Sequence, residues 1–171
     1  MPMPCERSMI RLYSKKKNKP TVIVAESDPY ASALVVCLLE GTGTEVVTVQ
    51  NGREAVAMCH RAKDSIVLAA ADLPDLDAAS FLREARSEKN RNLFLMMVEG
   101  KSRVNSAEMI RRGAWEVLAK PIDAKTFPLV IRRALAKRSL HRNIDFLKGV
   151  TAFLIVMIPL VMTAGILLAL D

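Results

Sequence analysis

Residues 21–29 read Thr-Val-Ile-Val-Ala-Glu-Ser-Asp-Pro, and this stretch decides the fold. Its first five residues are mostly β-branched and apolar without alternation, which is typical of a parallel strand buried on both faces. Asp28 followed by Pro29 favours a helix start, because aspartate caps helix N-termini and proline fits the first helical position. A buried strand that leads directly into a helix predicts one βα unit of a parallel α/β sheet.

The same alternation continues to residue 136. Further strand-like segments occupy residues 45–49, 66–70, 93–98 and 116–119, and apolar residues at helical spacing follow each of them. Gly41 or Gly43 is expected to end the first helix and Gly113 the fourth, whereas the fifth is expected to start between Asp123 and Thr126. Five strands alternating with five helices predict a doubly wound parallel sheet with helices on both faces.

Residues 150–170 are uncharged and strongly apolar, and Asp171 follows them. Since about 20 apolar helical residues span the ~30 Å hydrocarbon core of a bilayer, they predict one transmembrane helix; a buried core helix is the alternative. The basic residues just before this segment are Arg132, Arg133, Lys137, Arg138, Arg142 and Lys148. The positive-inside rule then places the N-terminal domain in the cytoplasm, with residues 137–149 as a basic helical linker at the membrane.

The net charge of +7 fits attraction to an anionic membrane leaflet. Residues 1–19 form a basic segment with little apolar periodicity, which we expect to be disordered. No helix combines basic and base-reading side chains, so nucleic acid is not an expected partner. Cys37 and Cys59 lie in apolar helical patterns and are expected in the core, and no residues have metal-ligand spacing.

Three segments resemble the receiver domain of two-component response regulators, in matching order and spacing. They are residues 22–29, the loop Asp72-Leu-Pro-Asp-Leu-Asp77, and residues 112–121, Arg-Gly-Ala-Trp-Glu-Val-Leu-Ala-Lys-Pro. The resemblance covers residues 20–136. It implies a flavodoxin-like fold with sheet order 2-1-3-4-5 and a site at the carboxyl ends of strands one, three and five.

In a working receiver that site holds two acids that bind Mg²⁺, an aspartate that accepts a phosphoryl group, a hydroxyl and a lysine. The matching positions here hold Glu26 and Ser27 for the acids with Asp28 beside them, Ala70 for the aspartate, Val98 or Met97 for the hydroxyl, and Lys120 for the lysine. A methyl group cannot accept a phosphoryl group. The resemblance therefore implies a degenerate receiver, or pseudo-receiver, without catalytic residues, Mg²⁺ or another cofactor, in which Lys120 is expected to pair with Glu26.

Two functions follow from this pattern. The favoured prediction is a non-enzymatic docking or scaffold module in signalling. We expect it to be held by its tail in the bacterial inner membrane, to bind a cytoplasmic or membrane-associated protein, and to have homodimerisation as an option. The alternative is a phosphorylation-responsive regulator that uses Asp72, two residues past the acceptor position, as its acceptor.

Overall fold

The computed structural model describes residues 19–62, 64–87, 90–100 and 106–169 of the 171-residue chain; within the last helix, the side chains of residues 140–149 and 160–169 lie outside the description. The chain divides into two compact units, Met1–Arg132 and Arg133–Asp171. Each unit is described by itself.

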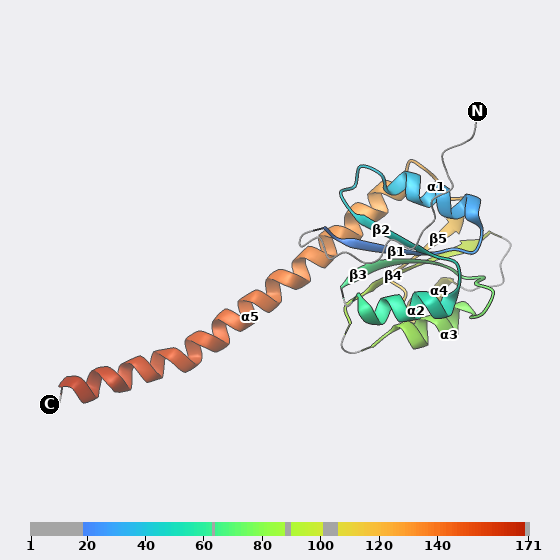
Figure 1. Cartoon of the computed structure of the whole chain (residues 1–171). Helices are drawn as coiled ribbons and strands as arrows, with labels where there is room; N and C mark the ends of the chain where they lie inside the picture. Colours follow the sequence, from blue (N-terminus) through green and yellow to red (C-terminus); the bar gives the residue numbers. More distant parts are fainter. Residues whose placement is uncertain (1–18, 63, 88–89, 101–105, 170–171) are drawn as a thin grey trace. The chain divides into compact units, whose positions relative to one another are not determined.

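The first unit contains a single parallel sheet whose strands have the order β2-β1-β3-β4-β5. The strands are β1 Thr21–Ala25, β2 Glu45–Val49, β3 Ser65–Ala70, β4 Leu93–Glu99 and β5 Glu116–Lys120. The helices are α1 Pro29–Leu39, α2 Gly52–Arg61, α3 Ala78–Ala85, α4 Ser106–Arg111 and α5 Phe127–Ala169, which continues into the second unit. Figure 1 shows α1 on one face of the sheet and α2 and α3 on the other. The predicted fold class and strand order are confirmed.

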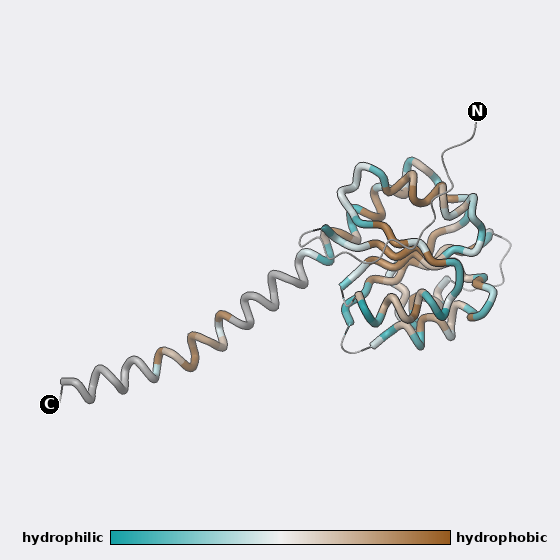
Figure 2. Tube along the Cα trace, viewed as in Figure 1, coloured by the Kyte–Doolittle hydropathy of each residue, from teal (hydrophilic) through white to brown (hydrophobic). Residues whose placement is uncertain are grey.

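The central strands form the core of this unit. Every residue of β1 and β3 is buried, as expected for strands without apolar alternation, and Figure 2 shows their apolar stretches between the helical layers. Phe81 of α3 meets Phe94 of β4 edge to face, with ring centroids 6.2 Å apart. Phe127 and Ile131 at the start of α5 are also buried. The apolar core of this unit thus lies between the sheet and the helices that flank it.

Side-chain caps set the starts of three helices. Asp28, Asn51 and Asp77 accept hydrogen bonds from backbone N–H groups in the first turns of α1, α2 and α3. The expected cap at Asp28 is therefore confirmed. Helix α1 ends at Leu39, two residues before Gly41, which has a positive φ of 81° that glycine adopts at little cost.

The two cysteines of the described residues lie in different environments. Cys59 is buried, and burial raises the pKa of its thiol to about 12. Cys37 is exposed, so the prediction that it is a core residue is wrong. Helix α1 is apolar on nearly all sides, so its periodicity could not indicate which face packs on the sheet. Val35 and Leu39, four residues apart, are the buried pair, and Cys37 lies between them on the opposite side.

Helix α5 contains both the predicted linker, residues 137–149, and most of the predicted membrane segment. Side chains on several sides of this helix are exposed and apolar: Val150, Phe153, Leu154, Ile155, Val156 and Ile158. Within the described part of the chain, no helix meets the length and apolarity required to cross a bilayer. The predicted transmembrane helix is thus not found there. The side chains of Arg142, Lys148 and residues 160–171 lie outside the description, as do residues 1–18 of the predicted disordered segment.

Candidate functional site

The carboxyl ends of β1, β3 and β5 bring three charged side chains together. Glu26 follows β1, Asp72 follows β3, and Lys120 is the last residue of β5. Lys120 Nζ lies 2.7 Å from Glu26 Oε2 and 3.6 Å from Asp72 Oδ1. The expected pairing of Lys120 with Glu26 is therefore present, and Asp72 adds a second, longer contact.

The two carboxylates differ strongly in burial. The Glu26 side chain is 2% exposed, whereas that of Asp72 is 56% exposed and that of Lys120 is 17% exposed. Glu26 Oε1 also accepts a hydrogen bond from the backbone N–H of Asp28 at 3.2 Å. The contact of Oε2 with Lys120 is close but not aligned as a hydrogen bond, so it is an ion pair. Both oxygens of the buried carboxylate are thereby compensated.

The pKa of Lys120 reflects this environment. Burial lowers the pKa of the ammonium group, but contacts with Glu26 and then Asp72 outweigh burial, so the pKa is raised above its ordinary value. Lys120 is therefore charged at neutral pH. Its charge is balanced by carboxylates of this chain, without a phosphoryl group.

The position that the resemblance matches to the phosphoacceptor holds an alanine. Ala70 ends β3, is 1% exposed, and lies beside Met97 of β4 in the parallel register. Met97 is also buried, and Val98 follows it, so neither candidate for the hydroxyl position supplies an oxygen. Ser27, at the second acidic position, is exposed. Glu26 and Lys120 therefore meet at this edge of the sheet, whereas Ala70, Met97 and Val98 bring no side-chain oxygen to it.

A divalent cation has few ligands here. Hard cations such as Mg²⁺ prefer several carboxylate or carbonyl oxygens. In the described residues, no group of three or more His, Cys, Asp or Glu side chains could hold a metal ion. Glu26 and Asp72, the acids that face the site, already contact Lys120. The donor set does not fit Mg²⁺, because the lysine ammonium occupies the place between the two carboxylates.

The loop after β3 is held against a helix that is distant in sequence. Asp75 accepts hydrogen bonds from the backbone N–H groups of Gly52 at 2.6 Å and Arg53 at 2.9 Å. A Cβ atom at Gly52 would lie 2.9 Å from Leu76 Cβ, so glycine allows this close approach. Sequence reasoning missed the role of Asp75, because a surface aspartate in a turn gives no signal of a partner more than 20 residues away.

This contact predicts an acid-sensitive loop. Slight burial raises the pKa of Asp75, but hydrogen bonds from Arg53 and Gly52 outweigh it and lower the pKa overall. The contribution to stability is thus present above the unfolded-state pKa of about 3.9 and is lost as the pH falls through the lower folded-state value. We expect Asp75→Asn to lower the free energy of unfolding by about 1 kcal/mol at pH 7, and by less near pH 3. Urea unfolding measures this, with Glu99→Gln as an exposed control; equal losses at both pH values would contradict it.

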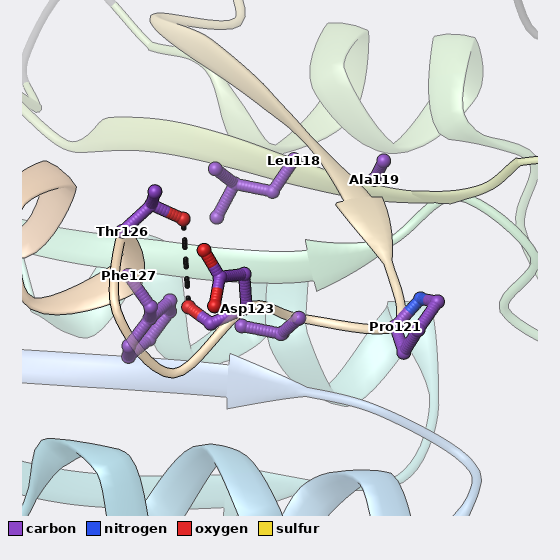
Figure 3. A pocket seen from close by; sticks show the side chains of 7 residues that line it. Leu118, Ala119, Pro121, Asp123, Thr126 and Phe127 are labelled. Carbon is purple, nitrogen blue, oxygen red and sulfur yellow. Dashed lines mark hydrogen bonds between the residues drawn. The ribbon is translucent and has the colours of Figure 1, made fainter.

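A separate hollow of about 240 Å³ lies between β5 and the start of α5 (Figure 3). Its lining consists of Leu118, Ala119, Pro121, Ile122, Asp123, Thr126 and Phe127. The Asp123 carboxylate accepts a hydrogen bond from the backbone N–H of Lys125, and the Thr126 hydroxyl donates one to the Asp123 carbonyl. These hydrogen bonds lie within the turn before α5, and this turn forms one wall of the hollow.

A comparison with known protein families agrees with this fold. The family model of the response regulator receiver domain matches residues 22–132. The chain belongs to this family. The matched residues lie within the first unit of the chain and include nearly all of its sheet and the helices beside that sheet.

Relatives and solved structures agree with this assignment. The receiver domain is 29% identical over 105 residues to the Regulatory protein AtoC of Escherichia coli, covering 61% of this chain and 23% of AtoC. It is 26% identical to the probable transcriptional regulatory protein TcrX of Mycobacterium tuberculosis, covering 73% of this chain and 53% of TcrX. The signal receiver domain of a putative Luxo repressor protein from Vibrio parahaemolyticus superposes with a TM-score of 0.69 at 20% identity, covering 74% of this chain and 98% of that one.

The chain spans only part of these curated relatives, about a quarter of AtoC and half of TcrX. The similarity to the Vibrio structure, at 20% identity, shows a common fold and nothing about the chemistry of the site.

Proposed function

We propose that this receiver domain is a pseudo-receiver, a static protein-docking or scaffold module in signalling that aspartyl phosphorylation does not switch. The observation that carries the proposal is the buried Ala70 methyl at the acceptor position. The ion pair between Lys120 and Glu26 supports it, because the lysine that would contact a phosphoryl group is already balanced. The module has no catalytic activity and no need for Mg²⁺.

We further propose that residues 150–170 hold the module in a membrane. Phe153, Leu154, Ile155 and Val156 are consecutive exposed residues, and four consecutive residues point to all sides of a helix. Such a helix needs apolar surroundings on every side. Arg132, Arg133, Lys137 and Arg138 precede the segment and favour a single pass with the receiver domain in the cytoplasm, at the inner membrane of a bacterium.

The partner proposed for this module is a signalling protein, cytoplasmic or membrane-associated, with a second copy of the chain as a further option. Several relatives are named as transcriptional regulatory proteins, including ZraR of Salmonella typhimurium, of which the chain covers 27%. The part that is shared with ZraR is the receiver domain, so a role in gene regulation through nucleic acid is not part of the proposal.

Asp72 supports a second candidate function, a regulator with a non-standard phosphoacceptor. Its carboxylate is half exposed and lies 3.6 Å from Lys120, the group that would offset the charge of a phosphoryl group. In-line transfer, however, requires close placement of the attacking oxygen. Asp72 lies on the loop after β3, two residues past Ala70. Its carboxylate therefore starts from a different backbone position than a side chain at the end of the strand.

Exposure to a small phosphodonor separates the two functions. The full chain is incubated with acetyl phosphate and Mg²⁺, and intact-mass spectrometry and phosphate-affinity electrophoresis follow a phosphoryl adduct that hydroxylamine removes. We expect no adduct on the wild-type chain. An adduct that disappears in Asp72→Asn but persists in the matched loop variant Asp75→Asn would contradict the pseudo-receiver proposal and establish the alternative.

A further inference from the structure

The ends of α3 and α4 are connected by an arginine. Arg86, the residue after α3, donates a hydrogen bond of 3.0 Å from Nη1 to the backbone carbonyl of Arg112, the residue after α4. The last carbonyls of a helix have no partner within the helix, so this contact satisfies one of them. The two helix ends therefore lie next to each other, although 26 residues separate Arg86 from Arg112.

Gly113 makes room for this arginine. Its φ of 101° is one that glycine adopts easily. A Cβ atom at this position would overlap the Nη1 and Cζ atoms of Arg86 and lie 2.9 Å from its Nε atom, so the guanidinium group lies directly against the backbone. Because the hydrogen bond and this contact already fix the group, little side-chain freedom remains to be lost when Arg86 binds a partner.

Three further arginines on the two helices contact carboxylates. Glu108 binds two of them, because its Oε1 lies 2.7 Å from Arg112 Nε and its Oε2 accepts hydrogen bonds from Arg111. The contacts with Arg111 and then Arg112 lower the pKa of Glu108 below its ordinary value, so Glu108 is charged at neutral pH. Arg83 of α3 lies 3.8 Å from Glu84. One carboxylate of the chain is thus already bound by two guanidinium groups at this surface.

Arg86 itself has no carboxylate partner among the described residues. Its one hydrogen bond to them from the side chain uses Nη1, and it takes part in no ion pair with them. Asp77 lies at the opposite end of α3, where it caps the helix. Arg86 is exposed, and the Nε–H and Nη2–H groups form the other edge of its guanidinium group. This edge offers two parallel donors, which match the two oxygens of a carboxylate.

The charges around Arg86 fit a small number of carboxylates. The arginine surface, as we call it, consists of Arg83, Arg86, Arg111 and Arg112. Glu84 and Glu108 lie among these four arginines, so positive charge is in excess, but only modestly. A nucleic-acid backbone is usually bound by a more extended basic patch or stripe. Acidic side chains of a protein are therefore the better match in both charge and geometry.

We propose that the arginine surface docks an acidic segment of the partner protein, and that the Nε–H and Nη2–H groups of Arg86 bind one of its carboxylates in a bidentate manner. The inference rests on the proposed docking function and adds the chemistry of the partner. Arg86 is the anchor of the contact, because its guanidinium group is held in place before the partner arrives. The other three arginines attract further acidic side chains around this anchor.

Binding of an acidic peptide tests this anchor. The probe is a fluorescein-labelled oligoglutamate peptide, and fluorescence anisotropy measures its dissociation constant with the full chain in a non-ionic detergent. Salt at about 0.15 M screens exposed charges that are more than about 8 Å apart, so distant basic residues contribute little. Arg86→Gln is expected to weaken binding about tenfold, because hydrogen bonds between charged groups are lost. An unchanged dissociation constant would overturn the proposal.

Two matched variants separate this anchor from general charge. Arg61→Gln removes the same charge from an exposed arginine at the end of α2 and is expected to change the dissociation constant less than about twofold. Arg86→Lys keeps the charge and a donor for the carbonyl of Arg112, but a lysine lacks the planar fork, so binding is expected to stay almost as weak as in Arg86→Gln. Equal losses in Arg61→Gln and Arg86→Gln, or full binding in Arg86→Lys, would overturn the assignment to a bidentate contact.

A second probe tests whether the ligand is a protein carboxylate. A fluorescein-labelled single-stranded oligonucleotide with the same number of charges carries phosphates in place of carboxylates, and Arg86→Gln is expected to leave its binding unchanged. An equal loss of binding for both probes would mean that the surface responds to charge alone and would overturn the assignment to an acidic protein segment. The acetyl phosphate experiment tests the pseudo-receiver proposal separately, since a phosphoryl adduct there would not alter the dependence of peptide binding on Arg86.

Discussion

Replacing Lys120 by methionine is expected to lower the free energy of unfolding by about 3 kcal/mol, which is the lower end of the range for breaking a buried ion pair. The loss comes mainly from Glu26, whose 2%-exposed carboxylate would lose the ammonium group that lies 2.7 Å from it. Asp72 lies farther from the ammonium and is half exposed, so Asp72→Ala is expected to cost less than about 1 kcal/mol. Urea unfolding of the full chain in a mild detergent, followed by the fluorescence of Trp115, the single tryptophan, measures both effects.

The same ion pair predicts how stability changes at high pH. The folded-state pKa of Lys120 is raised, because its contacts with Glu26 and Asp72 outweigh the opposing effect of burial. The resulting stabilisation is therefore fully present below the unfolded-state pKa of about 10.4 and is lost as the pH rises through the folded-state value. The difference in stability between the wild-type chain and Lys120→Met is expected to shrink above that pH.

A double-mutant cycle tests whether Glu26 is the cause. Glu26→Gln removes the buried charge, so Lys120→Met combined with Glu26→Gln is expected to be more stable than the sum of the two single losses predicts. Lys125→Met is the matched control, because Lys125 lies on the same connection after β5 but is exposed. A loss in Lys125→Met as large as that in Lys120→Met, or additive losses across the cycle, would contradict the role assigned to the pair.

The fold was largely predictable from local sequence. The apolar strands of the sheet are short and clearly bounded, and β1 and β2 begin and end at the predicted residues. The start of a helix was also predictable where aspartate and proline are adjacent in the sequence, as at α1. The sequence did not predict which side of α1 packs on the sheet. Its residues are apolar on nearly all sides, so their periodicity does not distinguish a buried side from an exposed one. Cys37 was misplaced for this reason.

The part of the candidate site that depends only on the strand order was predictable. The meeting of Glu26 and Lys120 required only that β1 and β5 end at the same edge of the sheet. The second contact of Lys120 with Asp72, and the attachment of Asp75 to the start of α2, depend on the path of the loop after β3. Loop paths follow from contacts between distant residues, which no local pattern records.

Deleting residues 150–171 is expected to move the protein from the membrane fraction to the soluble fraction while the receiver domain stays folded. The described apolar core of the first unit, from Val22 of β1 to Ile131 of α5, lies outside the deleted segment, so we expect this core to stay buried without residues 150–171. Fractionation in high salt and in alkaline carbonate measures the attachment. High salt alone should not release the full chain, because apolar burial is insensitive to the screening that weakens basic contacts with lipid.

A point variant separates insertion into the bilayer from adhesion to its surface. Ile155→Arg combined with Val156→Arg places two charges among exposed apolar residues, and each arginine costs about 2.5–3.5 kcal/mol at the centre of a membrane helix. This variant is expected to behave like the deletion, whereas Ile110→Arg, at an exposed apolar residue of α4, is expected to remain with the membrane. Aggregation of the deletion variant would mean that residues 150–171 cover part of the receiver core, and release of Ile110→Arg would place the attachment in the receiver domain itself.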